Sequence, residues 1–339
     1  MNKLIIGMML LVSQLAQGAD CTIAQKQDIL SNSTKEVYLS CNLILDNTDV
    51  VTRNIFITKS DISVMCNRGV LAGVTIKSPF IKSEFNEIHN ITIKKCELLG
   101  QLRILGHSRN GEDINNVNLS KNINHTEYSQ RIAPHHITLE SNVFNAKNTI
   151  AIYLAPGVNN VTVNNSTIRG TSVSTAIYLD AESGYNTISN NAIYTVTERE
   201  LIAIDGSANN TITGNKFSSL EHGGIYLYRN CGQNGAVRHQ TPSFNIISGN
   251  QFYYKNCTPF TCAPSIWVSS RNQGLVPVLG YCGEDKGVFK TGKTSSTDNN
   301  DNAEGNKIFS NTFVNATPVF MIQDTEFNYK NLIYGNIEK

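Results

Sequence analysis

Hydrophobic and polar positions follow one another in a motif that returns along the chain at nearly constant spacing. The motif is Asn-x-Ile-x-x-Asn-x-Ile/Phe, in which each asparagine precedes an apolar residue by two positions. Four close copies begin at Asn186, Asn210, Asn245 and Asn306. Four weaker copies surround the apolar residues Ile93, Leu119, Leu139 and Val163. The repeat is therefore about 24 residues long once two insertions are allowed.

A second short apolar segment precedes the motif in each repeat. Its copies are Ala151–Ala155, Ala176–Asp180, Leu201–Asp205, Gly224–Tyr228 and Ser265–Ser269. Short strands with polar turns also occur in β-sandwiches, but a sandwich does not keep a fixed period with like residues at like positions. A coil whose rungs stack on similar neighbours does. The pattern predicts an all-β solenoid, a parallel β-helix with rungs of about 24 residues.

Stacking of rungs would place equivalent residues in columns. The apolar column that we expect to face inward consists of Ile93, Leu119, Leu139, Val163, Ile188, Ile212, Ile247 and Ile308. A ladder is expected beside it, formed by Asn142, Asn191, Asn215, Asn250 and Asn311. An amide both donates and accepts hydrogen bonds, so copies about 4.8 Å apart can bond along the axis. We expect one domain over residues 20–339, with an N-terminal cap at about 20–50 and loop insertions near 231–241 and within 255–304.

With these repeats, the chain resembles the right-handed parallel β-helix superfamily of pectate-lyase-like proteins over roughly Val37 to Tyr334. The segments from Val51 to Thr58 and from Asp61 to Val70 are similar to the first rungs of such proteins. The resemblance implies a right-handed coil and action on a polysaccharide, by lyases, hydrolases, epimerases or non-enzymatic modules. The chain lacks the Asp-Pro-His-Asp motif of alginate epimerases and the paired-Asp, Gly-His-Gly and Arg-Ile-Lys set of polygalacturonases. Both of these activities are therefore disfavoured.

The first nineteen residues have the composition of a signal peptide. A positive start at Lys3 is followed by the apolar run Leu4–Val12 and by Ala16-Gln-Gly18, a small-x-small cleavage pattern. We expect export to the periplasm or the medium, with no membrane span after signal removal. All eight cysteines follow the signal, so disulfides are expected. The economical pairings are Cys21 with Cys41, and bridges among Cys231, Cys257, Cys262 and Cys282.

One outward column of the predicted coil is rich in aromatic residues. If the isoleucines and leucines of the second segment point inward, alternate residues must point outward. These residues are Tyr153, Tyr178, Ala203, Tyr226 and Trp267, with Phe320 as the expected continuation. Aromatic rings stack on the apolar faces of sugars, so this column predicts a polysaccharide as partner. The net charge of +1 lacks the basic excess typical of nucleic-acid binding.

Ionisable residues gather in the same rungs, which suggests catalysis. We assign catalytic roles to Asp180, Asp205, His222, Tyr228 and Arg229. The residues expected to bind substrate are Tyr153, Tyr178, Glu182, Arg199, Glu200, Tyr226, Asn230, Arg238, His239 and Trp267. The leading hypothesis is a lyase for a uronate polymer, because β-elimination requires a neutralised carboxylate and a base. Arg229, Arg199 or Arg238 would supply the cation, and Tyr228 or His222 the base.

Two other functions fit the same residues. Asp180 and Asp205 should lie one strand spacing apart, close enough to raise one pKa and to serve as the carboxyl pair of a glycoside hydrolase. A non-catalytic carbohydrate-binding or surface module is the third hypothesis. No cofactor is firmly indicated, although a calcium ion held by Asp180, Glu182 and Asp205 would be an alternative neutralising group.

Overall fold

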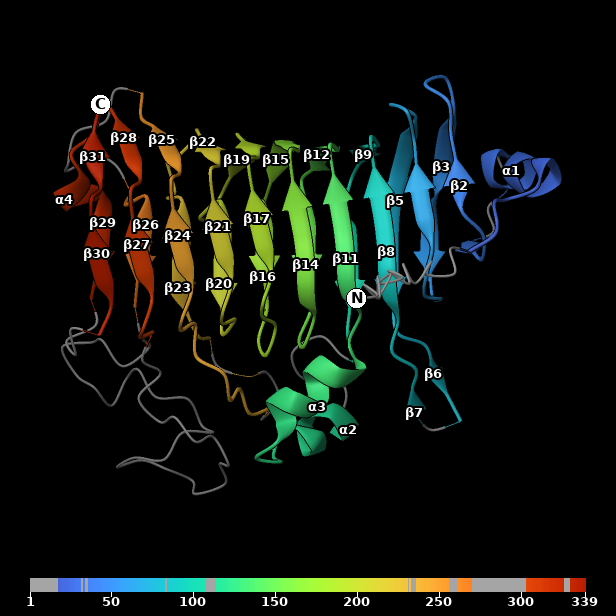
Figure 1. Cartoon of the computed structure of the whole chain (residues 1–339), viewed down its shortest axis with the longest axis horizontal. Coiled ribbons are helices and arrows are strands. Elements are labelled where there is room, and N and C mark those ends of the chain that lie inside the picture. Colours follow the sequence, from blue (N-terminus) through green and yellow to red (C-terminus); the bar gives the residue numbers. More distant parts are fainter. Residues whose placement is uncertain are drawn as a thin grey trace, which may run out of the picture.

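The structure is a computed structural model that describes residues 18–31, 33, 36–82, 84–107, 114–230, 232, 236–255, 261, 263–269, 303–325 and 330–339. Strands lie side by side across the long axis of the molecule (Figure 1). Within the described residues every strand pairing is parallel, except the pairing of β6 with β7. The prediction of a parallel β-helix is confirmed, and the strands form three faces, numbered below in chain order around one coil.

Face 1 is a single ten-stranded sheet of described residues, seen at the front in Figure 1. Its strands are β2 (Leu43–Ile44), β4 (Ser63–Met65), β8 (His89–Lys94), β11 (His135–Glu140), β14 (Asn159–Asn164), β17 (Thr187–Ser189), β21 (Thr211–Thr213), β24 (Ile246–Ser248), β27 (Lys307–Phe309) and β30 (Leu332–Tyr334). Each strand pairs with its equivalent in the next rung, so one coil of the chain advances the sheet by one strand.

Faces 2 and 3 belong to one larger sheet, because the long strands β3 (Val50–Ile57) and β5 (Val70–Lys77) run through both. Face 2 continues with β9 (Glu97–Leu99), β12 (Val143–Lys147), β15 (Thr167–Ser172), β18 (Ala192–Ile193), β19 (Val196–Thr197), β22 (Lys216–Phe217), β25 (Gln251–Tyr253), β28 (Thr312–Val314) and β31 (Ile337–Glu338). Face 3 contains β1 (Val37–Leu39), β10 (Leu102–Leu105), β13 (Ile152–Leu154), β16 (Ile177–Leu179), β20 (Ile202–Asp205), β23 (Ile225–Tyr228), β26 (Ile266–Val268) and β29 (Ile322–Asp324).

The corner between faces 1 and 2 is a tight turn, and it explains the middle of the sequence motif. The residue before each ladder asparagine has a positive φ, as at Asn190 (55°), Gly214 (67°) and Gly249 (63°). Glycine and asparagine adopt this left-handed conformation more readily than other residues. The motif thus contains a turn residue and a stacking residue in succession.

Inward residues form continuous apolar columns. On face 1 the registered pairs run from Val163 through Ile188, Ile212 and Ile247 to Ile308, and all five are buried. On face 2, Phe217, Phe252 and Phe313 stack with ring centroids 4.8 and 5.2 Å apart. The predicted core column is confirmed at these positions.

The prediction that the weak repeat copy around Leu119 forms a rung of the coil is wrong. Leu119 ends helix α2 (Ile114–Leu119), is exposed, and is followed by helix α3 (His125–Ile132). The inward neighbour of Leu139 is therefore Ile93 itself. A three-position match of apolar and polar residues cannot distinguish a strand corner from a short helix when propensities are weak.

Asparagine ladders occupy two corners of the coil. The predicted ladder is confirmed: Asn191 donates from both its backbone and side-chain nitrogens to the side-chain oxygen of Asn215, at 2.9 and 3.0 Å. Asn215 bonds to Asn250 in the same way. The first asparagine of the motif builds a second ladder, at the corner between faces 3 and 1, which the sequence analysis did not separate from the turns. Its members are Asn186, Asn210, Asn245, Asn306 and Asn331.

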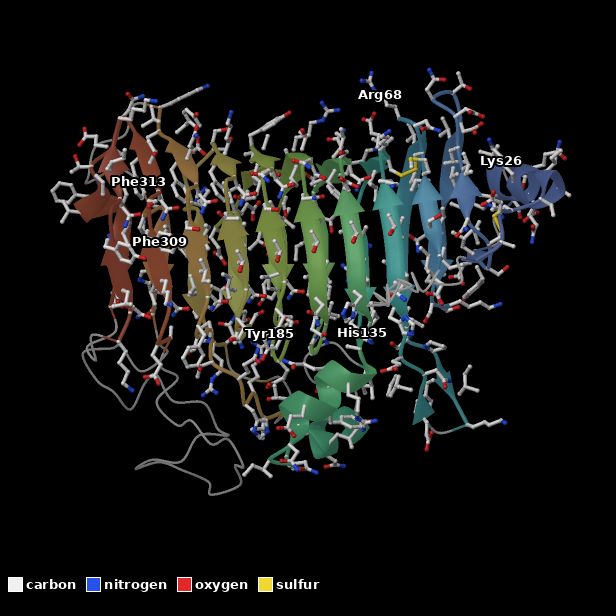
Figure 2. The ribbon with its side chains drawn as sticks, viewed as in Figure 1. Lys26, Arg68, His135, Tyr185, Phe309 and Phe313 are labelled. Carbon is white, nitrogen blue, oxygen red and sulfur yellow. A yellow bond between two sulfur atoms is a disulfide. The ribbon has the colours of Figure 1, made fainter. Side chains whose placement is uncertain are left out.

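The N-terminal end of the coil is closed by helix α1 (Ile23–Leu30), whose Ile29 is buried against it. The predicted disulfide Cys21–Cys41 is confirmed, and Cys66–Cys96 joins neighbouring rungs. Figure 2 shows both bonds in yellow toward this end. Disulfides persist in oxidising compartments, which agrees with the expected export. Residues 1–17, most of the expected signal peptide, and the last four cysteines lie outside the described residues.

Three insertions with described residues leave the coil at the corner that follows face 3. The hairpin β6 (Phe80–Ile81) and β7 (Glu84–Phe85) follows β5, helices α2 and α3 follow β10, and residues 229–244 follow β23. Figure 1 shows the hairpin and the helices projecting from the same edge. The insertions therefore form a wall along one side of face 3. Of the two predicted insertions, residues 236–241 are described, whereas most of 255–304 lies outside the described residues.

Helix α4 (Pro318–Met321) connects β28 on face 2 with β29 on face 3. None of the helices in the described ranges has both the length and the hydrophobicity that crossing a bilayer requires.

We expect Asn215→Leu to destabilise the coil. The substitution leaves two buried donors of Asn191 without their acceptor, and each such group costs about 1 to 3 kcal/mol. Chemical denaturation would measure the loss in free energy of unfolding. Lys216→Leu, at the exposed next residue, is the control. Equal stability of the two variants would contradict a ladder that stabilises the fold.

Candidate functional site

The outward column of face 3 is aligned rung by rung. Tyr153 pairs with Tyr178, Tyr178 with Ala203, Ala203 with Tyr226, and Tyr226 with Trp267. The four aromatic side chains are partly exposed. We call Tyr153, Tyr178, Tyr226 and Trp267 the aromatic platform.

The platform is divided in the middle. Tyr153 and Tyr178 have ring centroids 5.9 Å apart, and Tyr226 meets Trp267 edge-on at 5.3 Å. Ala203 separates the two pairs and leaves a gap one rung wide. The side chains within each pair contact each other, so bracing is part of their role, but their outer surfaces remain accessible.

The two ends of the column differ from the sequence prediction. Phe320 does not continue it, because Phe320 belongs to helix α4 and the neighbour of Trp267 is Gln323. At the other end, Arg103 pairs with Tyr153, and its guanidinium carbon lies 5.6 Å from the ring centroid. The sequence analysis missed Arg103. The alternation Leu102-Arg-Ile104 was a usable signal, but helices α2 and α3 interrupt the period after it.

Asp180 and Asp205 lie side by side below the platform, as the repeat predicts, but they are buried, with 3% and 0% exposure. The Arg238 guanidinium lies between them, 2.7 Å from Asp180 Oδ1 and 2.6 Å from Asp205 Oδ1. The hydroxyl of Tyr153 donates to Asp180 at 2.6 Å, and that of Tyr178 donates to Asp205. A glycoside hydrolase needs its two carboxyl groups in contact with substrate. The prediction of a hydrolytic pair is therefore wrong for this arrangement.

The two carboxyl groups differ in pKa. Burial raises the pKa of Asp180, with the charge of Arg238 opposing and that of Asp205 reinforcing the effect. Burial also acts to raise the pKa of Asp205, but Arg238, the Tyr178 hydroxyl and the backbone N–H of Asn230 outweigh it, so the pKa is lowered. One ionised carboxylate is thus fully hydrogen-bonded beside Arg238, as a buried ion pair requires.

Calcium does not fit the three acidic residues expected to bind it. Arg238 takes the space between Asp180 and Asp205, and Glu182 accepts the backbone N–H groups of His239 (2.6 Å) and Gln240 (3.2 Å). Across the described part of the chain, no three His, Cys, Asp or Glu side chains are grouped to hold a metal ion. The carboxylates instead anchor the loop of residues 236–240.

Several predicted substrate contacts are buried in this anchor. Arg229 has no exposed surface and donates to the carbonyls of Arg238 (2.9 Å) and His239 (3.1 Å). Arg238, His239 and Glu182 are buried as well. The assignments of Arg229 and Arg238 as substrate neutralisers, and of Glu182 and His239 as substrate contacts, are therefore corrected to structural roles. Strand alternation could not reveal this burial, because the loop and helices that cover these residues come from distant sequence.

A second polar cluster lies beside the Ala203 gap. The Tyr228 hydroxyl donates to Glu200 Oε1 at 2.5 Å, and Arg199 Nη2 lies 3.2 Å from Glu200 Oε1 and 2.7 Å from the Tyr228 oxygen. Tyr228 and Glu200 are buried, whereas 44% of the Arg199 side chain is exposed. Burial and the charge of Glu200 raise the pKa of Tyr228 well above its usual value. Tyr228 is therefore unsuited to the predicted role of base.

His222 and Arg199 lie in adjacent rungs, just before face 3 begins. The backbone N–H groups of Leu201 and Ile202 donate to the carbonyls of Gly223 and Gly224, in the register that pairs Ile202 with Ile225. His222 and Arg199 each precede these paired isoleucines by three residues. His222 is exposed, as is Asn230 at the other end of β23. Of the predicted ionisable residues, Arg199 and His222 are thus the accessible pair on this side of the platform.

Three histidines join the wall to the loop. The ring of His125 lies 5.4 Å from that of His107 and 5.9 Å from that of His239. The Ser129 hydroxyl lies 3.0 Å from His107 Nε2 and 3.3 Å from His125 Nε2, and His239 Nε2 lies 2.6 Å from the Ser120 carbonyl oxygen. Burial lowers the pKa of His125 to about 4, and the neighbouring histidines reinforce this shift while Glu182 opposes it.

We expect the free energy of unfolding to fall as the pH drops from about 6.5 to about 4. In that window the unfolded chain protonates His125 while the folded chain keeps it neutral, so acid favours unfolding by up to about 3 kcal/mol. Denaturant titrations at several pH values would measure the slope for the natural chain and for His125→Gln. The variant should lose the part of the slope due to His125, and identical slopes would contradict the assignment.

Comparison with known proteins identifies the fold. The family model described as "Right handed beta helix region" matches residues 102–274, just over half of the chain. No curated protein sequence matches the chain. Among solved structures, the Dettilon tailspike protein is 12% identical, with a TM-score of 0.33, and the match covers 94% of this chain and 65% of the tailspike chain. From the family match, in agreement with the stacked parallel strands, the chain belongs to the right-handed β-helix family.

Proposed function

We propose that the chain binds a polysaccharide along face 3, over the aromatic platform and beside the wall of insertions. The observation that carries the proposal is the registered, partly exposed set Tyr153, Tyr178, Tyr226 and Trp267. The platform spans five rungs, so its ends are four rung spacings or about 19 Å apart, the length of several sugar units. Aromatic rings in such a row can stack on successive sugars.

The cations beside the platform favour an acidic polymer. Arg103 lies against Tyr153 at one end, and the half-exposed Arg199 lies at the Ala203 gap. Among the described residues, both hydrogen bonds of Arg199 use its Nη2 atom. Its Nε and Nη1 groups lie on different edges of the guanidinium, and each can donate a charge-assisted hydrogen bond to an acidic sugar.

We expect Trp267→Ala and Tyr226→Ala to weaken polysaccharide binding, each by about 1 kcal/mol or more, because each removes a stacking surface. Affinity electrophoresis or calorimetry with a panel of acidic and neutral polysaccharides would measure the change. Tyr253→Ala on face 2, also an exposed aromatic on a β-strand, is the matched control. If both platform variants bind as tightly as the control, the platform has only the bracing role.

A lyase reaction on a uronate polymer is the more specific form of this function, supported by the presence of Arg199 and the exposed His222 in adjacent rungs at the start of face 3. The Arg199 guanidinium would neutralise the uronate carboxylate and stabilise the charge that develops on it. His222 would remove the proton from the carbon that bears the carboxylate; the electron pair would form a double bond to the next ring carbon as the bond from that carbon to the glycosidic oxygen breaks. The departing oxygen would take up a proton from water, which gives an unsaturated sugar and a new chain end. These two residues replace Arg229 and Tyr228 in the proposed mechanism.

We expect Arg199→Ala and His222→Gln each to reduce turnover by about 10²-fold or more on an acidic polymer. The ultraviolet absorbance of the unsaturated product would measure turnover, and Glu221→Gln, at the neighbouring exposed residue, is the control. Binding without formation of this product, or of any new reducing end, would favour the non-catalytic module instead.

A further inference from the structure

We infer that the buried carboxylates Asp180 and Asp205 are positioning residues that fix two rings of the aromatic platform, Tyr153 and Tyr178. The effect on binding rests on the proposed function, but the fixing of the rings does not. Asp180 and Asp205 do not touch a ligand in this assignment. They act through the two tyrosine hydroxyls.

Each of the two tyrosine hydroxyls bonds to a carboxylate in the next rung toward the C-terminus. The Tyr153 hydroxyl donates to Asp180 Oδ2 at 2.6 Å, in the rung of its neighbour Tyr178. The Tyr178 hydroxyl donates to Asp205 Oδ2, again one rung further on. Each ring is therefore tethered at its polar end to a carboxylate that has almost no exposed surface, while its carbon surface stays partly exposed.

The carboxylates are themselves held firmly. Asp180 Oδ1 accepts the backbone N–H of Ala181 at 2.8 Å, and Asp205 Oδ1 accepts that of Asn230 at 2.7 Å. Arg238 joins both oxygens from the loop of residues 236–240. A hydrogen bond to an ionised acceptor is stronger than one between neutral groups. The carboxyl groups are fixed by the coil and by the wall, so the tyrosine rings bonded to them are held in place as well.

The other half of the platform, Tyr226 and Trp267, has no such bond to a carboxylate among the described residues. By the same relation Ser269 corresponds to Tyr226 and Thr325 corresponds to Trp267, and neither residue carries a carboxylate. Those two rings meet edge-on instead. The half at Tyr153 and Tyr178 therefore presents pre-set ring surfaces whose hydroxyls are already used within the protein.

Two consequences follow for a ligand on this half of the platform. It can stack on ring carbon but does not gain hydrogen bonds from the two hydroxyls. The rings also lose little motion on binding, because they are already ordered. Ordering a free side chain on binding lowers affinity by about two- to tenfold, so this is the loss expected when a tether is removed.

A double-variant cycle tests the assignment. Tyr153→Phe and Asp180→Ala are made singly and together, and the affinity for the polysaccharide that the natural chain binds is measured by calorimetry. Each single variant should bind about two- to tenfold more weakly, and the double variant no more weakly than either. The cycle of Tyr178→Phe with Asp205→Ala should behave alike. Additive losses, which indicate that the hydroxyls contact the ligand directly, or no loss in either Tyr→Phe variant would overturn the assignment.

The control separates positioning from general stability. Asn215→Leu removes a buried polar contact between faces 1 and 2 and should lower the melting temperature with affinity unchanged. The Tyr→Phe variants conserve shape and keep the test valid if an Asp→Ala variant fails to fold.

A readout without ligand separates this inference from the proposed function. Carbon-13 relaxation of labelled tyrosine and phenylalanine rings should show Tyr153 and Tyr178 ordered in the natural chain, and the ring at the same position more mobile in Tyr153→Phe and in Tyr178→Phe. If the rings are equally ordered with and without the hydroxyl, the positioning role of Asp180 and Asp205 is wrong, even if the polysaccharide binds. Unchanged binding in Trp267→Ala and Tyr226→Ala would instead count against the proposed function alone.

Discussion

The stacking of asparagine side chains along two corners of the coil is the interaction on which the rest of the structure depends. Each ladder amide accepts the backbone N–H of the previous rung and donates within the stack, so a rung can occupy only one register relative to its neighbour. A slip of one residue would reverse inward and outward side chains on every face. Because the ladders prevent such a slip, alternation within a three-residue strand is enough to decide which residues enter the core and which reach the surface.

The fixed register also brings reactive side chains together, since residues 25 positions apart in sequence become neighbours. It brings Asp180 next to Asp205. Two like charges this close in a buried site repel each other, so a positive charge is needed beside them. Arg238 supplies the compensation from the loop that follows β23. The arrangement joins the loop, the coil and two platform tyrosines in one hydrogen-bonded unit, and the histidines of the wall pack against it. Burial of these charged residues holds the loop against the coil and removes their side chains from the surface.

Membership of the right-handed β-helix family establishes the coil but does not choose a reaction, because the function of such a scaffold depends on the side chains of one face. Around the platform the accessible groups include aromatic rings, two arginines and a histidine, while Asp180, Asp205 and Glu200 are buried. That distribution supports a binding surface for an acidic sugar polymer, with elimination as the chemistry that its accessible cation and imidazole could perform. It does not support hydrolysis by paired carboxylates.

The sequence by itself determined the coil, the core column around Ile188 and Ile212, the ladder through Asn215 and the alignment of Tyr153, Tyr178, Tyr226 and Trp267. All of these follow from a local period, and stacking converts a local period directly into neighbours in space. The tertiary structure alone decided that helices replace the weak rung at Leu119 and that Phe320 leaves the column. It also decided that Arg229, Arg238 and the carboxylates of Asp180 and Asp205 are buried. Burial at these positions depends on insertions outside the period, whose path is set by contacts such as Glu182 with His239 and Gln240. No repeat in the sequence encodes these contacts, because each is made once between segments that lie far apart along the chain.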